Sequence, residues 1–222
     1  MLVGICQNDP MTSRLPSDET PQPAGDAEAP ELPATSRAVL GILSFGEELS
    51  GYDIKRWADQ SLAFYYWAPS QSQIYTELRR LERLGLAVSR LEQTHSAKTR
   101  RLYSITEAGR GRLVDWAENG APEAVVLKHS MVMRLWAGHN GDTAGLSGRW
   151  AEYGRLARST AERAGAHAEN AGKTPAWRFP VLALEWAQKY YQDEADRAEW
   201  VVRRLAELEA EDGRGEAFRP AP

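Results

Sequence analysis

Apolar residues recur with helical spacing in three short segments of the first half of the chain. The first, SRAVLGILSFG, runs from Ser36 to Gly46 and ends at a glycine, a common residue just past a helix. The second begins after Ser50, a favourable N-cap residue. The third lies between another N-cap candidate, Ser70, and Gly85 just past its end. The pattern predicts three helices joined by short connections.

Two segments with alternating polar and apolar residues follow the third helix, Leu86–Gln93 and Thr99–Ile105. A polar tip, THSAK, joins them and predicts a β-hairpin. Thr106 then caps a fourth predicted helix. Three helices, a hairpin and a further helix indicate a winged helix-turn-helix over residues 36–118. In that architecture the third helix enters the major groove of DNA, and the hairpin wing reaches the adjacent backbone or minor groove.

The second half, residues 119–212, is predicted to be helical, with segments Pro122–Gly138, Asp142–Gly172 and about Pro180–Glu211. Along the last segment an apolar stripe recurs at spacings of three and four residues, which is typical of a helix that packs along its length. Two or three long helices of a single chain would bury such a stripe poorly. We therefore expect homodimerisation. The residues assigned to the dimer interface are Leu184, Ala187, Tyr191, Ala198, Val202 and Leu205.

The predicted fold is therefore mainly α with a small β-hairpin wing. It combines an N-terminal winged helix-turn-helix domain, residues 36–118, with a C-terminal long-helix dimerisation and effector domain, residues 119–212. Residues 1–35 are rich in Pro, Asp and Glu and too poor in apolar residues to offset the entropy of ordering, so they predict a disordered acidic extension. We favour a passive tail, although an acidic arm could compete with DNA for a basic surface. Residues 213–222 predict a flexible tail.

Charge is distributed unevenly along the chain, whose net charge is −4. Residues 1–35 hold one basic and six acidic residues, whereas residues 36–118 hold twelve basic and ten acidic residues. Nucleic-acid binding requires a basic surface rather than a basic chain, so the overall charge does not exclude it.

Cysteine content and hydropathy restrict the class of protein further. The single cysteine, Cys6, excludes an intramolecular disulfide framework and a zinc site built from cysteines. No apolar run reaches the roughly 18 residues of a membrane helix. The N-terminus lacks a basic region and a long apolar region, so it is a poor secretory signal. We expect a cytoplasmic protein with no membrane partner.

The third predicted helix has an apolar side, with Ile74, Leu78 and Leu81, and a polar side rich in hydroxyl and arginine groups. Such groups can bind phosphate and base edges, and arginine can bind guanine through two hydrogen bonds. The alternative is a solvated polar face, which a neighbouring basic wing makes less favourable. Arg100 and Arg101 alternate along a strand, so at most one of them faces DNA. The candidate DNA-binding residues are Ser70, Gln71, Ser72, Gln73, Tyr75, Thr76, Arg79 and Arg83 on the helix, with Lys98 and Arg100 in the wing.

Tryptophan is abundant, with eight residues, and several lie in the helical second half. Aromatic side chains between helices can stack on flat hydrophobic ligands, so we consider an effector site that contains Trp136 or Trp186. The alternative is that these rings only fill a core or an interface. No catalytic motif and no glycine-rich phosphate loop occurs. His129 and His139 form at most a weak metal pair, so we expect no catalytic residue, metal or cofactor.

Three motifs are similar to those of the PadR family of transcriptional regulators: GYDI (Gly51–Ile54), QIYTELRRLERLGL (Gln73–Leu86) and YSITEAG (Tyr103–Gly109). The resemblance spans Ala38 to about Trp116, and the segment LEW…EWVVRRLAEL resembles the larger type of C-terminal region in this family. It implies a homodimeric winged-helix regulator, usually a repressor, that binds a pseudo-palindromic operator and responds to small aromatic or hydrophobic effectors. It also implies that Tyr75 lies near DNA.

The sequence therefore predicts a DNA-binding transcriptional regulator, a repressor released by a small hydrophobic or aromatic effector. A second hypothesis is a non-enzymatic interaction module that uses both domains for assembly. A metal- or cofactor-dependent enzyme is the least supported. The arginine-rich helix face and the basic wing favour the first hypothesis over the second.

Overall fold

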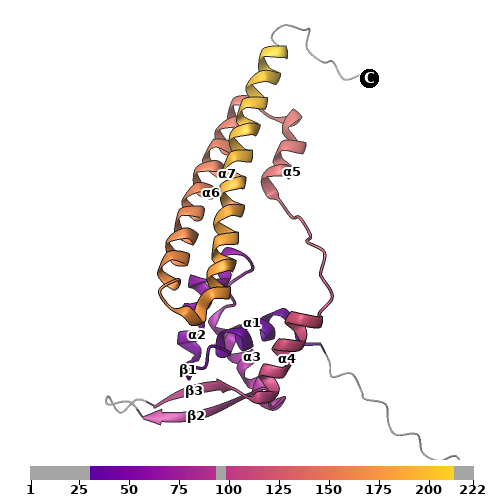
Figure 1. Cartoon of the computed structure of the whole chain (residues 1–222). Coiled ribbons are helices and arrows are strands. Elements are labelled where there is room, and N and C mark those ends of the chain that lie inside the picture. Colours follow the sequence, from indigo (N-terminus) through magenta and orange to yellow (C-terminus); the bar gives the residue numbers. More distant parts are fainter. Residues whose placement is uncertain (1–30, 94–98, 213–222) are drawn as a thin grey trace, which may run out of the picture. The chain divides into compact units, whose positions relative to one another are not determined.

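The computed structural model describes residues 31–93 and 99–212 of the chain. The chain divides into Met1–Glu31 and a compact unit, Leu32–Pro222. Within that unit, Figure 1 shows short helices beside a small sheet, and a pair of long helices. The predictions for most of the acidic extension and for the C-terminal tail fall on residues outside the described ranges.

Three short helices build the N-terminal core: α1 (Ala34–Leu43), α2 (Gly51–Gln60) and α3 (Gln71–Arg83). The apolar stripe predicted for α3 is fully buried against α1 and α2. Each buried Leu or Ile side chain stabilises the fold by about 1.5–3 kcal/mol relative to an exposed one. Helix α1 starts at Ala34 rather than Ser36, and α2 ends at Gln60.

Helix ends follow the predicted capping residues. At α2 the Ser50 hydroxyl accepts from the Asp53 backbone N–H at 3.2 Å, and the Asp53 carboxylate accepts from the Ser50 backbone N–H at 3.2 Å. Ser70 and Gln73 form the same reciprocal capping box at α3. Gly85 adopts a φ of 68°, the left-handed conformation that glycine takes most readily after a helix. All three predicted positions are confirmed.

The sheet has three antiparallel strands in the order β1-β3-β2. The predicted hairpin is confirmed as β2 (Ala87–Gln93) and β3 (Thr99–Ile105). A third strand, β1 (Leu49–Ser50), pairs with β3 on its other side and was not predicted. With two residues it is too short to show an alternating pattern in the sequence. It is a strand because its backbone pairs with β3.

Helix α4 (Glu107–Asn119) closes the N-terminal region next to the base of the wing. Thr106 caps it as predicted, accepting from the Gly109 N–H at 3.1 Å, and also donates from its hydroxyl to the Gly85 carbonyl at 2.7 Å. A β-carbon at Gly109 would lie 2.2 Å from the Leu86 carbonyl oxygen. Glycine is therefore required for α4 to approach the start of the wing.

The C-terminal region contains α5 (Ser130–Trp136), α6 (Thr143–Ala171) and α7 (Arg178–Asp212), with single 3-10 turns η2 (Gly138–Asn140) and η3 (Pro175–Trp177). The long predicted helices are confirmed. The helix predicted over Pro122–Gly138 is wrong in its first half, because residues 121–129 form neither helix nor strand. A segment that is apolar on much of its circumference needs burial on several sides to be a stable helix. Here Val125 is 94% exposed.

Helix α6 buries the apolar stripe of α7 within the same chain. Leu184, Ala187, Ala198 and Leu205 are all at most 6% exposed, whereas Tyr191 and Val202 are partly buried. Small residues on α6 permit this close packing: a β-carbon on Gly154 would lie 3.1 Å from the Ala198 β-carbon. The premise that the stripe requires a second chain is therefore wrong. The assignment of its residues to a dimer interface stays a prediction.

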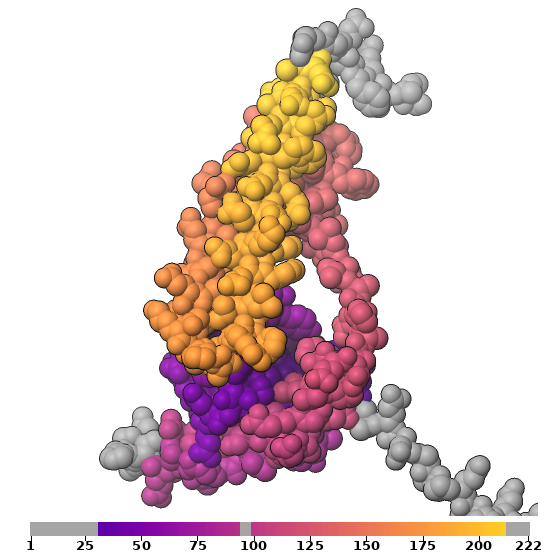
Figure 2. Space-filling view, in the orientation of Figure 1, coloured from indigo at the N-terminus to yellow at the C-terminus, as the bar shows by residue number. Residues whose placement is uncertain are grey.

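One aromatic side chain attaches the N-terminal helices to this pair. The turn η1 (Leu62–Phe64), between α2 and α3, places Phe64 in a buried cluster with Ala164 and Ala168 of α6 and Leu184 of α7. Figure 2 shows the orange start of α7 in contact with the indigo N-terminal segment. Phe64 therefore connects the segment that precedes α3 to the two long helices.

Candidate DNA-binding surface and effector cavity

One side of α3 forms a continuous exposed polar face, as the helical period predicted. Of the eight predicted helix residues, only Gln71 is partly buried; the exposed ones are Ser70, Ser72, Gln73, Tyr75, Thr76, Arg79 and Arg83. We refer to this set as the α3 face. Its role in DNA binding stays a prediction.

Hydrogen bonds on the α3 face separate structural residues from available ones. The side chains of Ser70 and Gln73 are used by the capping box. Thr76 donates to the Ser72 carbonyl at 2.9 Å, and its hydroxyl accepts from Arg79 Nη2 at 3.4 Å. The hydrogen bond from Arg79 to Thr76 holds a guanidinium beside a hydroxyl. This combination can bind phosphate or a base edge.

Tyr75 lies at the edge of this face, against the start of α2. A β-carbon on Gly51 would lie 2.6 Å from the Tyr75 ring, so only glycine leaves room for the ring at this position. Tyr75 nevertheless remains 39% exposed. The ring is therefore held in place by α2 while part of it stays accessible from outside.

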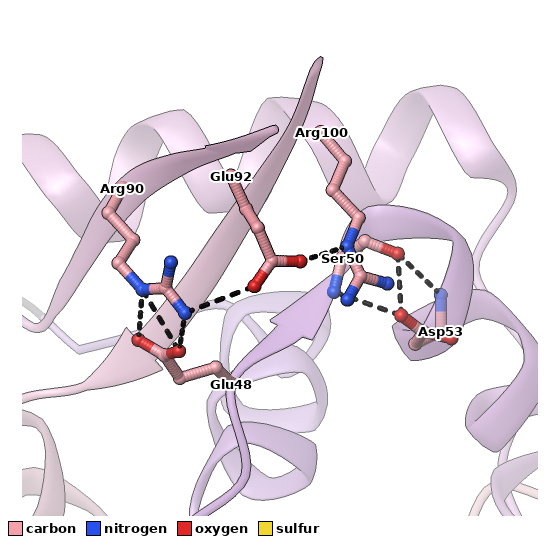
Figure 3. A network of polar contacts seen from close by, with 6 residues as sticks. All are labelled: Glu48, Ser50, Asp53, Arg90, Glu92 and Arg100. Carbon is pink, nitrogen blue, oxygen red and sulfur yellow. Dashed lines mark hydrogen bonds and ion pairs between the residues drawn. The ribbon is translucent and has the colours of Figure 1, made fainter. Parts of the chain in front are cut away.

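The wing carries a network of ion pairs on one face (Figure 3). Arg90 Nε on β2 donates to both carboxylate oxygens of Glu48, at 2.8 and 3.0 Å, and Arg90 Nη2 lies 3.4 Å from Glu92. Arg100 Nε on β3 donates to Glu92 at 2.6 Å. The predicted DNA contact Arg100 is therefore paired with a carboxylate, and the other predicted wing contact, Lys98, lies outside the described residues.

The network affects the ionisation of its carboxyl groups. Hydrogen bonding from Arg90 lowers the pKa of Glu48, and hydrogen bonding from Arg100 lowers the pKa of Glu92. Burial raises the pKa of Asp53, but its hydrogen bonds with Ser50 outweigh burial and leave that pKa lowered. All three carboxylates are charged at neutral pH, so this face of the wing carries little unpaired positive charge.

Arg101 lies on the opposite face of the wing. Its Nη1 donates to the Ser89 hydroxyl at 3.0 Å, and Ser89 in turn donates to Glu82 of α3 at 2.5 Å. Arg101 is exposed and shares this side with α3. Arg100 and Arg101 alternate along β3, and Arg100 is the residue predicted to contact DNA, whereas Arg101 is the one on the α3 side. The register and the Ser89–Glu82 bond are the signals that distinguish the two.

A cavity of about 960 Å³ lies among α1, α2, η1, α4 and the adjoining ends of α6 and α7. Its walls are mainly apolar and aromatic. Trp57 lies 5.9 Å from Phe45 and 5.3 Å from Trp177 between ring centroids, so residues from three parts of the chain form an aromatic cluster. Its aromatic lining residues are Phe45, Trp57, Tyr65, Tyr66, Trp116, Trp177 and Phe179.

The polar groups of the cavity are few. Arg37 pairs with Glu123 at 3.1 Å and lies 5.1 Å from the Trp116 ring, so its charge is compensated. Burial raises the pKa of Tyr65, which keeps its phenol protonated. Trp136 and Trp186, the predicted effector residues, are 81% and 59% exposed and do not line this cavity. Their role in effector binding stays a prediction without support from this geometry.

A separate buried polar cluster fixes α5 to the long helices. The Glu194 carboxylate accepts from the Tyr153 hydroxyl at 2.7 Å and from Arg197 Nη1 at 2.6 Å, and His129 Nε2 lies 2.9 Å from it. Burial raises the pKa of Glu194, but these hydrogen bonds outweigh it and the net pKa is lowered. His129 is thus engaged with Glu194, whereas His139 contacts Asn140. Across residues 31–93 and 99–212, no group of three potential metal ligands occurs.

Comparison with known proteins identifies the N-terminal region. Residues 39–115 match the family described as "Transcriptional regulator PadR-like family". The "Negative transcriptional regulator PadR" of Bacillus subtilis (strain 168) is 31% identical over 99 residues, which cover 45% of this chain and 53% of that protein. The winged-helix region is therefore similar to the PadR-like family of transcriptional regulators. The chain spans about half the length of this curated relative.

Solved structures extend the similarity to the C-terminal helices. Bacillus subtilis PadR in complex with operator DNA is 20% identical, with a TM-score of 0.71 over 79% of this chain and 99% of that chain. Bacillus subtilis PadR in complex with p-coumaric acid is 21% identical, with a TM-score of 0.62 over 77% and 94%. These matches establish a shared fold. In the described part of the chain, no helix combines the length and apolarity needed to cross a membrane.

Proposed function

We propose that this PadR-like regulator is a repressor that binds a specific operator through the α3 face. The observation that carries the proposal is the exposed, pre-oriented arrangement of Tyr75, Thr76 and Arg79 on the helix that enters the major groove in winged helix-turn-helix proteins. The relative from Bacillus subtilis is named a negative regulator, which supports repression. Binding to chromosomal DNA would place the protein in the cytoplasm.

The second part of the proposal is a homodimer on a pseudo-palindromic operator. Two α3 helices can read half-sites one helical turn apart, about 34 Å, only when a second copy holds them at that distance. Exposed apolar side chains provide surface for such a contact on the segment before α5 and on α5 and α7. They include Val125, Val126, Leu127, Met133, Trp136, Leu182 and Trp186. A second copy would shield these side chains from water, a role that suits Trp136 and Trp186 better than effector binding.

The third part is release by a small aromatic or hydrophobic effector bound in the 960 Å³ cavity. A related fold has been solved with p-coumaric acid, which supports a ligand of this class. The cavity lies between the helix-turn-helix and the long helices. A ligand that fits only one arrangement of these elements would therefore stabilise that arrangement. Its differential affinity for the two arrangements would then move the α3 helices and release DNA.

Fluorescence anisotropy with a labelled duplex from the protein's own upstream region tests the first part. We expect binding that weakens steeply with salt and exceeds the affinity for a scrambled duplex of equal length, because specific binding adds base contacts to phosphate contacts. Equal affinity for both duplexes would contradict sequence-specific binding. Absence of salt-sensitive binding to any promoter fragment would remove the repressor function altogether.

A further inference from the structure

The three arginines described in the wing differ in their surroundings. Arg90 and Arg100 belong to the network with Glu48 and Glu92 that Figure 3 shows. Arg101 contacts the uncharged hydroxyl of Ser89 instead. A carboxylate partner partly neutralises a guanidinium, whereas a hydroxyl partner carries no opposing charge.

The Arg90–Glu48 pair connects the two outer strands of the sheet. Arg90 on β2 is opposite Leu102 on β3, and Leu102 is opposite Ser50 on β1. Glu48 immediately precedes β1, so the side chain of Arg90 reaches it across β3. Leu102 is 4% exposed although it belongs to none of the apolar core clusters of the described residues. The ion pair therefore lies over Leu102 and ties the hairpin to the strand that starts α2.

Geometry indicates that this pair does more than an ordinary surface ion pair. Isolated exposed pairs contribute little because water and side-chain entropy oppose them. Here Arg90 binds both oxygens of Glu48, and Glu92 continues the network to Arg100, so four side chains restrain one another. Two-point arginine contacts of this kind restrict orientation as well as distance.

Arg101 faces the other way. Its partner Ser89 is bonded to Glu82 of α3, which places the Arg101 side of the wing next to the helix that carries Arg79. Burial and the nearby Glu82 carboxylate raise the pKa of Tyr103 on this side of the wing, while the Arg101 and Arg79 guanidinium groups partly oppose that rise. Arg101 and Arg79 are both exposed and belong to elements that the Ser89–Glu82 bond joins.

On the basis of the proposed function, we propose that Arg101 is the DNA contact of the described wing, and that Arg90 and Arg100 are positioning residues. Through Glu48 and Glu92 they hold the hairpin at the angle at which Arg101 reaches the DNA backbone. Arg101 neutralises a phosphate. Arg90 and Arg100 neutralise none.

The two roles have different experimental signatures. Each lost phosphate contact reduces the slope of log K against log salt concentration by about 0.9. Loss of a positioning residue loosens the wing and lowers affinity without reducing this slope by a full contact. It also increases amide hydrogen exchange in β2 and β3 of the free protein, because less stable elements open more often.

The experiment compares Arg101→Met, Arg90→Met and Arg100→Met with the wild-type chain, using anisotropy over a range of salt concentrations and hydrogen exchange without DNA. We expect Arg101→Met to reduce the slope by about 0.9 and leave wing exchange unchanged. We expect Arg90→Met and Arg100→Met to weaken binding several-fold, keep the wild-type slope and accelerate wing exchange. As a check of folding, hydrogen exchange outside the wing should match that of the wild-type chain in each variant.

Glu48→Gln provides a second, sharper comparison, because it breaks the pair without altering any arginine. As a positioning change it should weaken binding and accelerate wing exchange, as Arg90→Met does. If Arg90 bound phosphate, removing its competing carboxylate would tighten binding instead, and that result would overturn the proposal. A reduced slope in Arg90→Met with an unchanged slope in Arg101→Met would also overturn it. Failure of the wild-type chain to bind DNA would reject the proposed function itself, and wing exchange in Glu48→Gln would still test the positioning role.

Discussion

The ring of Tyr75 on α3 lies against Gly51 at the start of α2, so closely that a β-carbon on Gly51 would come within 2.6 Å of it. Two motifs that are separated in the sequence, GYDI and QIYTELRRLERLGL, meet at this contact. Glycine at position 51 is therefore needed for the orientation of a side chain on the α3 face. The contact links the helix-turn-helix geometry directly to the surface proposed to bind DNA.

Replacement of Gly51 by alanine should displace the Tyr75 ring and weaken operator binding. Overpacking of this kind lowers the free energy of unfolding by about 1–3 kcal/mol. If the ring swings outward instead, stability is kept and DNA binding is weakened. Chemical denaturation and anisotropy on the same variant measure the two effects. Gly111→Ala is a suitable control, because a β-carbon at Gly111 in α4 meets nothing within 4 Å. Operator affinity equal to wild type in Gly51→Ala would show that the position of Tyr75 is irrelevant to binding.

Replacement of Arg79 by alanine should weaken binding to the operator by about 1–3 kcal/mol, the range of one two-point contact with a base. The effect on a scrambled duplex should be smaller, because only a phosphate contribution is lost there. Competition titrations with both duplexes measure the difference. Arg149→Ala on α6, whose exposed side chain pairs with Glu152, should leave both affinities unchanged. Wild-type operator affinity in Arg79→Ala would remove this residue from the binding surface.

Truncation of Phe64 to alanine should lower the free energy of unfolding by about 3–5 kcal/mol, because its ring is buried between α6 and α7. Urea denaturation measures this loss. Phe179→Ala removes an exposed ring of the same size and should change stability by less than about 0.5 kcal/mol. Equal losses in the two variants would contradict the attachment of η1 to the long helices.

The Glu194 carboxylate should make stability depend on pH. Its folded pKa is lowered, so its contribution is fully present above the unfolded value of about 4.3 and is lost as pH falls through the folded pKa. At pH 7, Glu194→Gln should be less stable than wild type by about 1–3 kcal/mol, since Tyr153 and Arg197 lose a charged acceptor. Denaturation midpoints of both proteins between pH 7 and pH 3 should converge at low pH. Glu152→Gln, at an exposed position on α6, should track wild type throughout.

Aromatic effectors should quench the fluorescence of tryptophans that line the cavity. Trp57→Phe should remove part of this quenching and weaken effector binding by about 0.5–1.5 kcal/mol, the contribution of one aromatic contact. Trp136→Phe should leave the absolute loss of fluorescence on effector binding and the effector affinity unchanged, because Trp136 does not line the cavity. Titration of both variants with p-coumaric acid and larger flat aromatics measures this. If Trp136→Phe lost quenching and affinity while Trp57→Phe kept both, Trp136 would be the effector-binding residue instead.

The starts of α2, α3 and α4 could be predicted because each depends on neighbours a few residues away. Ser50, Ser70 and Thr106 cap helices through backbone groups three residues ahead. The polar face of α3 likewise follows from the helical period. Strand β1 could not be predicted, since its two residues are ordered by pairing with β3 far along the chain.

Other features depend on tertiary contacts that no local pattern contains. The partner of the α7 stripe is α6, whose alanines and Gly154 allow the two helices to approach closely. The cavity proposed to bind an effector has both Trp57 and Trp177 in its wall, and neither ring has a sequence neighbour that indicates the other. Alternation limited the wing to one of Arg100 and Arg101, but the choice between them depends on which face of the sheet lies next to α3.

Ser50 ends β1 and also caps α2, so no residue separates the strand from the helix. One added residue at this junction would move either the pairing of Ser50 with Leu102 or its capping box with Asp53 out of register. Residues 121–129 form no helix or strand, and residues 121–128 are exposed, so they can accommodate changes of length. Natural insertions, deletions and engineered tags should therefore be tolerated between α4 and α5, whereas the junction of β1 and α2 should keep a constant length among relatives.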